Sequence, residues 1–434
     1  MTHIRSIGSH PAAASLWAAT ASDAPPVAPL TQSAHADVVI VGAGFTGLST
    51  ALHLAEAGVN TCVLDAHAPA WGASGRNGGQ VNPTLKYDPN ELRRMFGAKA
   101  DALIQTVSTS ADLVFSLIDR HHIDCDAVRA GWIQASYHDK GVPALHRRAE
   151  QWQRLNIPVS CLDRDEILKR TGSNMFAGGW LDHRAGKLHP LSYARGLLRA
   201  ALSNGAQVHG NSPVTQLQRQ DGKWVATVAA GATVKADQVV LATNGYTDAL
   251  WPGLARTVLS ANSFIAATRP LGTAADHILA KGETLSTAER LMIYLSKDRD
   301  GRLLMGGRGQ FRDPKDRSDF LHLERSLELL YPQLAPFEIE YRWSGRIAIT
   351  RDFLPHIHQP EPGLTMALGY NGRGIAMSTS MGQQLAKLLC DRSGRDDFPF
   401  PITPIQPIPM HGLQRFYIAA GLAWYSLLDR LSKR

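Results

Sequence analysis

An apolar run that leads into closely spaced glycines constrains the fold more than any other part of this chain: Asp37-Val38-Val39-Ile40-Val41-Gly42-Ala43-Gly44-Phe45-Thr46-Gly47. A GxGxxG turn between a buried strand and a helix is typical of a dinucleotide-binding unit. The first glycine permits the tight turn, the second lets a pyrophosphate approach the backbone, and the third lets the helix pack close to the strand. We therefore expect Gly42, Gly44, Phe45, Thr46 and Gly47 to contact a nucleotide, with backbone N–H groups facing its phosphates.

The residues after this turn complete a strand, helix and strand unit. Apolar residues repeat at helical spacing through Leu48, Ala51, Leu52 and Ala55, and residues 61–64 read as the second strand. Asp65 lies 18 residues beyond Gly47, near the spacing at which an acidic side chain accepts hydrogen bonds from an adenosine ribose. The alternative is a helix that packs on the sheet without any nucleotide.

Length and charge favour an enzyme of more than one domain. The chain has 434 residues, and single cores stop growing at about 250–300 residues. Its 45 Lys and Arg against 38 Asp and Glu give a net charge of +7. This excess is spread along the chain, so it points only weakly to an anionic ligand and predicts no nucleic-acid partner. The four cysteines form no CxxC pair, which indicates reduced thiols.

The two ends of the chain give weaker signals. Residues 1–35 are rich in Ala, Pro, Ser and His and lack an apolar signal-peptide core, so we expect a flexible tail and a cytoplasmic protein. No apolar run approaches the roughly 20 residues needed to span a bilayer. The longest candidate, residues 416–428, is expected to belong to a C-terminal helix over 411–434 that packs on the body, the alternative being an anchor on a membrane surface.

A second glycine-rich segment, residues 71–80, follows soon after Asp65. Such a loop can bring several backbone N–H groups to one ligand, and its polar side chains suit a flat polar ring system or its phosphates. The alternative is a surface turn. The predicted cofactor contacts here are Ala73, Ser74, Gly75, Arg76, Asn77, Gly78 and Gly79.

Two later segments lead to the same site. Alternating residues from Val214 predict a strand meander that feeds a buried strand ending near residue 242. Ligands of open α/β sheets bind beyond the carboxyl ends of strands. A last glycine-rich loop opens the helix predicted over 375–389, whose N-terminus would stabilise negative charge on a ligand that it faced, unless it is an ordinary helix start. The further predicted cofactor contacts are Val214, Thr243, Asn244, Gly245, Gly369, Gly372, Arg373 and Gly374.

Several other catalytic classes lack their defining motifs. The chain contains no HExxH, no GxSxG and no GxxxxGK[ST], so nothing supports a metalloprotease, an α/β-hydrolase or a P-loop enzyme. Asp352, His356 and His358 lie close in sequence, but no second cluster completes a metal-binding set, and we predict no metal.

Taken together and in this order, the motifs resemble those of the D-amino-acid oxidase-like family of FAD-dependent oxidoreductases, and most of all its gamma-glutamylputrescine-oxidising members. The likeness spans about residues 36–410. It is carried by 42–47, 71–80, 188–190, 242–246, 343–355 and 369–374.

The resemblance implies an α/β fold with a Rossmann-like FAD-binding domain and an inserted α+β substrate domain built on a mixed or antiparallel sheet. The FAD-binding domain is expected to comprise residues 36–95, 165–255 and 345–410, and the substrate domain residues 96–164 and 256–344. Within the insertion, residues 263–268, 291–295 and 302–305 read as strands and 321–330 as a helix.

The family likeness also implies an activity. FAD is expected to oxidise the C–N bond of an amine resembling gamma-glutamylputrescine, by hydride transfer to flavin N5 and hydrolysis of the imine, and to pass electrons to oxygen or another acceptor. Tyr246, Tyr370 and Arg373 are the predicted substrate contacts, followed by His189 and Arg308.

Departures from the family pattern bear on the flavin and on the alternatives. Sarcosine oxidases carry a flavin-linking cysteine where this chain has Gly345, and a carboxylate-binding lysine near its Ala376, so non-covalent FAD and a different substrate anchor are implied. The alternatives are an amino-acid or secondary-amine dehydrogenase that reduces quinone, a non-catalytic flavoprotein, and an NAD-dependent dehydrogenase.

Overall fold

The first of two large sheets is built around the predicted dinucleotide unit. The computed structural model describes residues 15–289, 292–390 and 398–413. Parallel strands β18, β11, β1, β2 and β8 form the body of this eight-stranded sheet, β17 pairs antiparallel with β18, and β10 and β9 extend from β11 as a meander. The bounds are β1 Ala34–Val41, β2 Thr61–Leu64, β8 Gln207–His209, β9 Val214–Gln220, β10 Lys223–Val228, β11 Thr233–Leu241, β17 His356–Glu361 and β18 Leu364–Leu368.

Strand β1 is central to the sheet because both of its faces are apolar. Val38 and Ile40 belong to the core beneath the helices, whereas Val39 and Val41 belong to the core on the opposite face. Side chains alternate along a strand, and a parallel strand covered on both faces reads as a continuous apolar run. The sequence interpretation of this segment is confirmed.

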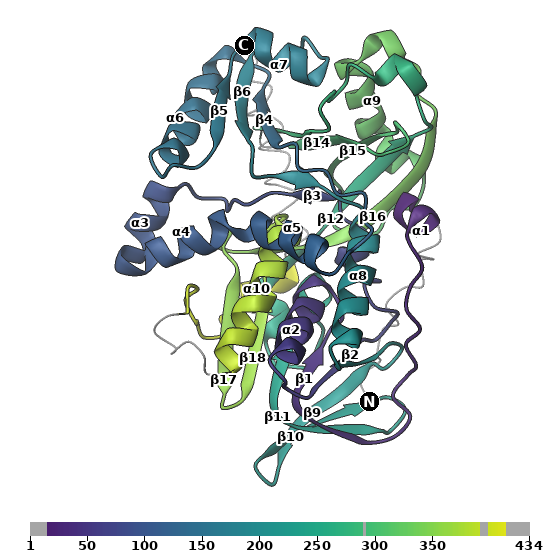
Figure 1. Ribbon diagram of the computed structural model, residues 1–434, viewed down its shortest axis with the longest axis vertical. Helices are drawn as coiled ribbons and strands as arrows, with labels where there is room; N and C mark the ends of the chain where they lie inside the picture. Colours follow the sequence, from purple (N-terminus) through teal and green to yellow (C-terminus); the bar gives the residue numbers. More distant parts are fainter. Residues whose placement is uncertain (1–14, 290–291, 391–397, 414–434) are drawn as a thin grey trace.

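Three helices cover one face of the first sheet. Figure 1 shows α2 (Phe45–Glu56), α8 (Pro190–Ser203) and α10 (Gly374–Leu389) side by side, and α2 contacts both of the others. The start of α8 follows from its sequence, since Pro190 occupies the first turn, where its missing N–H costs no hydrogen bond. The predicted helix over 375–389 is thus confirmed.

The second eight-stranded sheet lies at the other end of the molecule, with α6, α7 and α9 around it (Figure 1). Its order is β16-β12-β15-β14-β13-β4-β6-β5, and it is mixed because β13 pairs parallel with β4 whereas the other neighbours are antiparallel. The bounds are β4 Trp132–Ser136, β5 Val159–Leu162, β6 Gly178–Asp182, β12 Val258–Thr268, β13 Thr284–Thr287, β14 Ile293–Lys297, β15 Leu303–Arg308 and β16 Ile339–Thr350.

The remaining elements connect the two sheets or surround them. A short ribbon of β3 and β7 joins the glycine-rich loop to the segment before α8. The bounds are β3 Gln80–Val81, β7 Gly186–Lys187, α1 Leu16–Thr20, α3 Pro89–Phe96, α4 Ala100–Ser108, α5 Ser110–Arg120, α6 Val142–Gln153, α7 Arg164–Thr171 and α9 Leu321–Leu330. The strands and helix predicted within 263–330 correspond to β12, β14, β15 and α9.

The division of the chain between the sheets differs in part from the expected domain boundaries. Strand β6 belongs to the second sheet, although the expected boundaries put residues 165–255 on the FAD-binding side. Helices α4 and α5 share a hydrophobic core with α10, although the same boundaries put residues 96–164 in the substrate domain. Strand β16 runs across the expected boundary at 345. Pairing between segments far apart in sequence decides these assignments, and local patterns do not report it.

Part of the segment expected to form a flexible tail over 1–35 is a helix that packs on the body. Helix α1 is capped by the Ser15 hydroxyl, which accepts the Ala18 N–H, and Leu16 and Trp17 are buried. A helix of five residues is not stable alone, so tertiary contacts supply its order. Residues 414–434 of the predicted C-terminal helix lie outside the described residues.

Candidate cofactor and substrate site

The predicted cofactor residues gather at one edge of the first sheet. Strands β1, β2, β8, β11 and β18 are parallel, so their carboxyl ends meet at this edge. The segments that follow β1, β2, β11 and β18 are those that carry the glycine turn, Asp65, Thr243 to Tyr246 and Gly369 to Gly374. The topology therefore unites motifs that the sequence spreads over more than three hundred positions.

The glycine turn leaves no room for side chains at two of its positions. Gly42 has φ +108°, and a Cβ there would lie 2.9 Å from the carbonyl oxygen of Ala242 at the end of β11. A Cβ on Gly47 would lie 1.8 Å from the carbonyl oxygen of Gly42. Gly44 precedes α2 and offers no side-chain cap, so the first turn of the helix keeps N–H groups available for an anion.

Asp65 follows β2 and is tied to the glycine turn. Its Oδ2 accepts the Ala43 N–H at 2.7 Å, and its Oδ1 accepts the His67 N–H at 2.9 Å. Burial raises the pKa of Asp65, and these two hydrogen bonds oppose that rise. The Ser212 N–H donates to the Asp65 carbonyl at 2.7 Å, which brings the start of β9 at Val214 close in sequence to the same edge.

The loop over 71–80 crosses the start of α2. The Ser74 hydroxyl accepts the Phe45 N–H at 2.9 Å. Asn77 holds the loop internally: its side-chain amide donates to the carbonyls of Ala73 and Ser74, and its Oδ1 accepts the Gly79 N–H. The surface-turn alternative does not describe this segment, because the loop is built against the nucleotide turn.

Three glycines of this loop meet neighbours at close range. A Cβ on Gly75 would lie 2.4 Å from the Ala70 carbonyl oxygen, one on Gly78 would lie 2.5 Å from the Tyr294 ring, and one on Gly79 would lie 2.4 Å from the Leu188 carbonyl oxygen. Contact with Tyr294 of β14 brings the loop against the second sheet. The site therefore lies between the two sheets.

Arg76 anchors the loop and retains an unused donor. Its Nε donates to the Trp71 carbonyl at 2.9 Å, and its guanidinium lies 4.3 Å from the centre of the Trp71 ring. Its Nη2 is buried without a hydrogen-bond partner among the described residues. A buried donor without an acceptor is costly, so this atom indicates a ligand acceptor nearby.

Residues 243–246, after β11, and residues 369–374, after β18, are hydrogen-bonded to each other at the strand ends. Thr243 bonds through its hydroxyl to that of Thr247, and the Asn244 side chain accepts the Gly369 N–H at 2.9 Å. Gly245 packs against β16, since a Cβ added to it would lie 3.3 Å from the Arg346 carbonyl oxygen. A Cβ built on Gly372 or Gly374 would meet no atom of the described residues within 4 Å, apart from the chain neighbours and the backbone of α10 itself.

Tyr370 and Tyr246 have different surroundings. The Tyr370 side chain is buried, and its hydroxyl lies 2.7 Å from the Thr46 hydroxyl, so it holds the late loop against α2. Burial raises its pKa. Tyr246 is only partly buried and lies edge-on to Trp71 at 5.5 Å between ring centres, with the Arg346 guanidinium over its ring. Substrate contact by either tyrosine stays a prediction.

Arg373 forms the N-cap position of α10 and points its guanidinium at the second sheet. The guanidinium lies 5.0 Å from the centre of the Trp132 ring on β4. Burial, together with the charge of Arg148, lowers the pKa of Arg373 to about 9. Among the described residues, no carboxylate or carbonyl accepts a hydrogen bond from it. The side chain is only partly buried, so this guanidinium can bind an anion from solution.

The residues that the sequence suggested less strongly as substrate or metal contacts interact with neighbouring protein groups. His189 caps α8, because its Nδ1 accepts the Ser192 N–H at 3.1 Å, and burial lowers its pKa to about 4. Arg308 ends β15 and lies over the Phe311 ring. His356 pairs with Asp352 at 2.9 Å, and His358 bonds to the Thr403 carbonyl.

Four residues near this site were not predicted from the sequence as site residues: Trp17, Trp132, Arg148 and Tyr294. None of them belongs to a sequence motif that predicts ligand contact, and each reaches the site only through tertiary packing. For Trp17 alone a local signal existed, since Ser15 before an apolar pair is a helix start.

Comparison with known proteins identifies the family. The model of the FAD dependent oxidoreductase family, DAO, matches residues 37–388. The chain belongs to this family. It is 33% identical over 424 residues to gamma-glutamylputrescine oxidoreductase of Escherichia coli (strain K12), covering 96% of this chain and 98% of that protein. FAD is its cofactor, and the enzyme is an oxidoreductase of the family that acts on amines and amino acids.

Solved structures confirm the fold. The crystal structure of glycine oxidase from Geobacillus kaustophilus matches with a TM-score of 0.73 at 22% identity and covers 87% of this chain and 99% of that one. L-proline dehydrogenase from P. horikoshii matches with a TM-score of 0.72 at 17% identity, covering 84% and 95%. The predicted α/β class with a Rossmann-like FAD-binding domain is thus confirmed.

The residues at this edge fit FAD. The start of α2, where Ser74 accepts only the first N–H, and the N–H groups of the turn suit the pyrophosphate, and the start of α10 suits a negatively charged ring edge. The unpaired Nη2 of Arg76 is a buried donor that a bound polar ring would satisfy.

The flavin is expected to be non-covalently bound. Residues 343–355 contain no cysteine, and Cys62 and Cys125 are buried with pKa values raised to about 12, so neither offers a reactive thiolate. Precipitation of the purified enzyme with acid should leave all of the yellow colour in the supernatant. Flavin fluorescence that migrates with the denatured polypeptide in a gel would contradict this expectation.

Among the described residues, no helix is both long enough and apolar enough to cross a membrane.

Proposed function

We propose that this enzyme oxidises the primary amine of a gamma-glutamylated polyamine such as gamma-glutamylputrescine. The observation that carries the proposal is the Arg373 guanidinium, which lies at the start of α10 without a carboxylate partner among the described residues. The similarity to gamma-glutamylputrescine oxidoreductase of Escherichia coli over 96% of the chain supports the same substrate class. That substrate carries a free carboxylate at the end remote from its reacting amine.

The charges around Arg373 favour a carboxylate. Arg148 pairs with Asp88, and Arg184 pairs with Asp182 at 2.5 Å. Both of these carboxylates are therefore already matched, which leaves the charge of Arg373 without a counterion among the described residues. A guanidinium presents parallel N–H donors that fit the two oxygens of a carboxylate. Arg373 is proposed to bind the glutamyl carboxylate of the substrate.

The reaction itself requires little acid–base work from the protein. Bound FAD supplies a two-electron acceptor for the hydride that leaves the carbon next to the amine nitrogen. The nitrogen loses a proton, and water hydrolyses the resulting imine to an aldehyde and ammonia. The polypeptide orients the substrate and excludes water from the reacting carbon. A net positive site also disfavours the ammonium form of the amine, and only the neutral amine can react.

An anaerobic absorbance titration tests the substrate class. Gamma-glutamylputrescine should bleach the oxidised-flavin band at micromolar to millimolar concentration, and putrescine, which has the same primary amine but no carboxylate, should do so only at concentrations at least about tenfold higher. A yellow enzyme that gamma-glutamylputrescine does not bleach would contradict the proposal and leave the family assignment intact. Oxygen uptake during turnover would identify oxygen as the acceptor, and turnover only with an added quinone would identify a dehydrogenase.

A further inference from the structure

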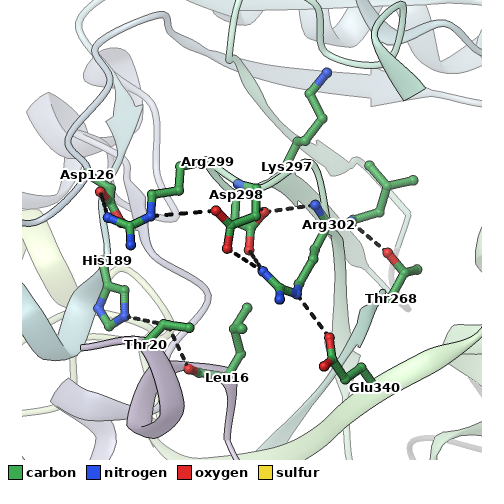
Figure 2. A network of polar contacts seen from close by, with 12 residues as sticks. Leu16, Thr20, Asp126, His189, Thr268, Lys297, Asp298, Arg299, Arg302 and Glu340 are labelled. Atoms are coloured by element: carbon green, nitrogen blue, oxygen red, sulfur yellow. Dashed lines mark hydrogen bonds and ion pairs between the residues drawn. The ribbon is translucent and has the colours of Figure 1, made fainter. Parts of the chain in front are cut away.

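The N-terminal segment is fastened to the body of the enzyme beside the cofactor loop. Figure 2 shows Thr20 of α1 beside His189, and the two side chains lie 3.1 Å apart. Because Nδ1 of His189 accepts the Ser192 N–H and the ring is neutral, its Nε2 carries the proton and donates to the Thr20 hydroxyl. The Ser22 N–H donates to the Ser192 hydroxyl at 3.1 Å. These contacts fix α1 on the start of α8.

Helix α1 uses this position to place an indole against the loop over 71–80. The Trp17 side chain is buried, and its Nε1 donates to the Asn77 carbonyl at 2.7 Å. Its ring lies edge-on to that of Trp343 on β16, at 5.9 Å between ring centres. Trp343 in turn donates from Nε1 to the Arg76 carbonyl at 2.9 Å. Two indoles from distant parts of the chain therefore donate hydrogen bonds to the successive carbonyls of Arg76 and Asn77.

The direction of these carbonyls decides the direction of the N–H groups that share their peptide planes. In a trans peptide the C=O and N–H bonds point in opposite directions. The N–H of Asn77 and that of Gly78 therefore point away from the two indoles. Neither finds a protein acceptor among the described residues. Successive N–H groups that face one way form a concave site for an electron-rich atom.

We infer that Trp17 and Trp343 are positioning residues for the flavin: they orient the N–H groups of Asn77 and Gly78 toward a polar edge of the bound ring system. Donors aimed at that edge stabilise negative charge that develops when the flavin is reduced. The buried, unpartnered Nη2 of Arg76 belongs to the same loop and adds a third donor. The N-terminal segment thus takes part in setting the affinity and reactivity of the cofactor.

Replacement of each indole by phenylalanine tests this inference. Trp17→Phe and Trp343→Phe keep an aromatic ring and remove the donor. Each is expected to weaken FAD binding to the apoprotein by about three- to tenfold, the effect of one lost hydrogen bond. Each should also shift the visible absorption maximum of the bound flavin and lower its midpoint potential. These properties are measured by fluorescence titration of the apoprotein, by absorbance and by a redox titration.

Trp224→Phe is the matched control, because Trp224 is equally buried and its Nε1 donates to a carbonyl, that of Pro362, in the core of the opposite sheet face. It should lower the melting temperature without any change in the flavin spectrum. If Trp17→Phe lowers the melting temperature as the control does and leaves the spectrum and the FAD affinity unchanged, the inference is wrong. Trp343→Phe keeps the test available if Trp17→Phe yields no folded protein.

Discussion

Gly47→Ala is expected to abolish FAD binding. The added Cβ would lie 1.8 Å from the Gly42 carbonyl oxygen and 3.3 Å from the Ile40 side chain. Neither neighbour can move freely, because β1 is hydrogen-bonded on one side to β11 and on the other to β2. Helix α2 must therefore shift away from the strand, and its N-terminus with it. Overpacking of this kind costs about 1–3 kcal/mol, and the displaced N–H groups no longer meet the phosphates.

The measurement is the ratio of flavin to protein absorbance after purification, together with FAD titration of the apoprotein. We expect Gly47→Ala to retain less than about a tenth of the wild-type flavin, because a helix displacement removes several phosphate contacts, each worth about 1 kcal/mol or more. Gly58→Ala is the control: apart from its chain neighbours, no atom of the described residues lies within 4 Å of the added Cβ, although the φ of +79° adds strain. Full flavin content in Gly47→Ala would contradict the proposed role of the turn.

The parts of the fold that depend on local pattern were predictable from sequence. The unit of β1, α2 and β2 follows from a buried run, a glycine turn and a helical repeat, each of which is specified within a few residues. Strands such as β12 and β15 were found for the same reason. Their neighbours were not, because pairing of β4 with β13 joins segments about 150 residues apart and depends on packing that no local pattern encodes.

The residues of the candidate site likewise fall into two groups: those that a local pattern predicts and those that only tertiary contacts bring to the site. Glycines whose Cβ would collide with backbone, such as Gly42 and Gly79, were identified because glycine is required there. Trp17 was not, because its contact with Asn77 joins the Ala-rich N-terminal segment to a loop 60 residues away. Arg373 was identified by its place in a glycine-rich loop, yet its lack of a counterion among the described residues becomes evident only when the surrounding carboxylates are seen paired to other arginines.

Arg373→Gln is expected to reduce kcat/KM for gamma-glutamylputrescine by about 100-fold or more, through KM more than kcat. Hydrogen bonds between charged partners contribute about 1.5–3 kcal/mol each, and a guanidinium can form two of them with one carboxylate. The reductive half-reaction, followed anaerobically in a stopped-flow instrument, measures both parameters. With putrescine, which lacks the carboxylate, the variant should differ from the wild type by less than about threefold.

Two comparisons separate carboxylate binding from other roles of this residue. Arg373→Lys keeps the charge and loses the planar pair of donors, so it should recover only part of the affinity. Arg164→Gln, at an exposed ion pair with Asp139, removes the same charge from the surface and should change neither parameter. Equal losses with gamma-glutamylputrescine and putrescine in Arg373→Gln would contradict the assignment and indicate an effect on the flavin or on the start of α10.

The lowered pKa of Arg373 leads to a second prediction about ligand binding at the same site. Burial and Arg148 lower its pKa to about 9, which means that the charged form is destabilised relative to water. A bound carboxylate would offset that cost, so ligand binding and stability must be linked. Glutarate, a dicarboxylate without an amine, should therefore raise the melting temperature of the wild-type enzyme and leave that of Arg373→Gln unchanged. Equal stabilisation of both proteins would show that the anion binds elsewhere, and the carboxylate of the substrate would then need another partner.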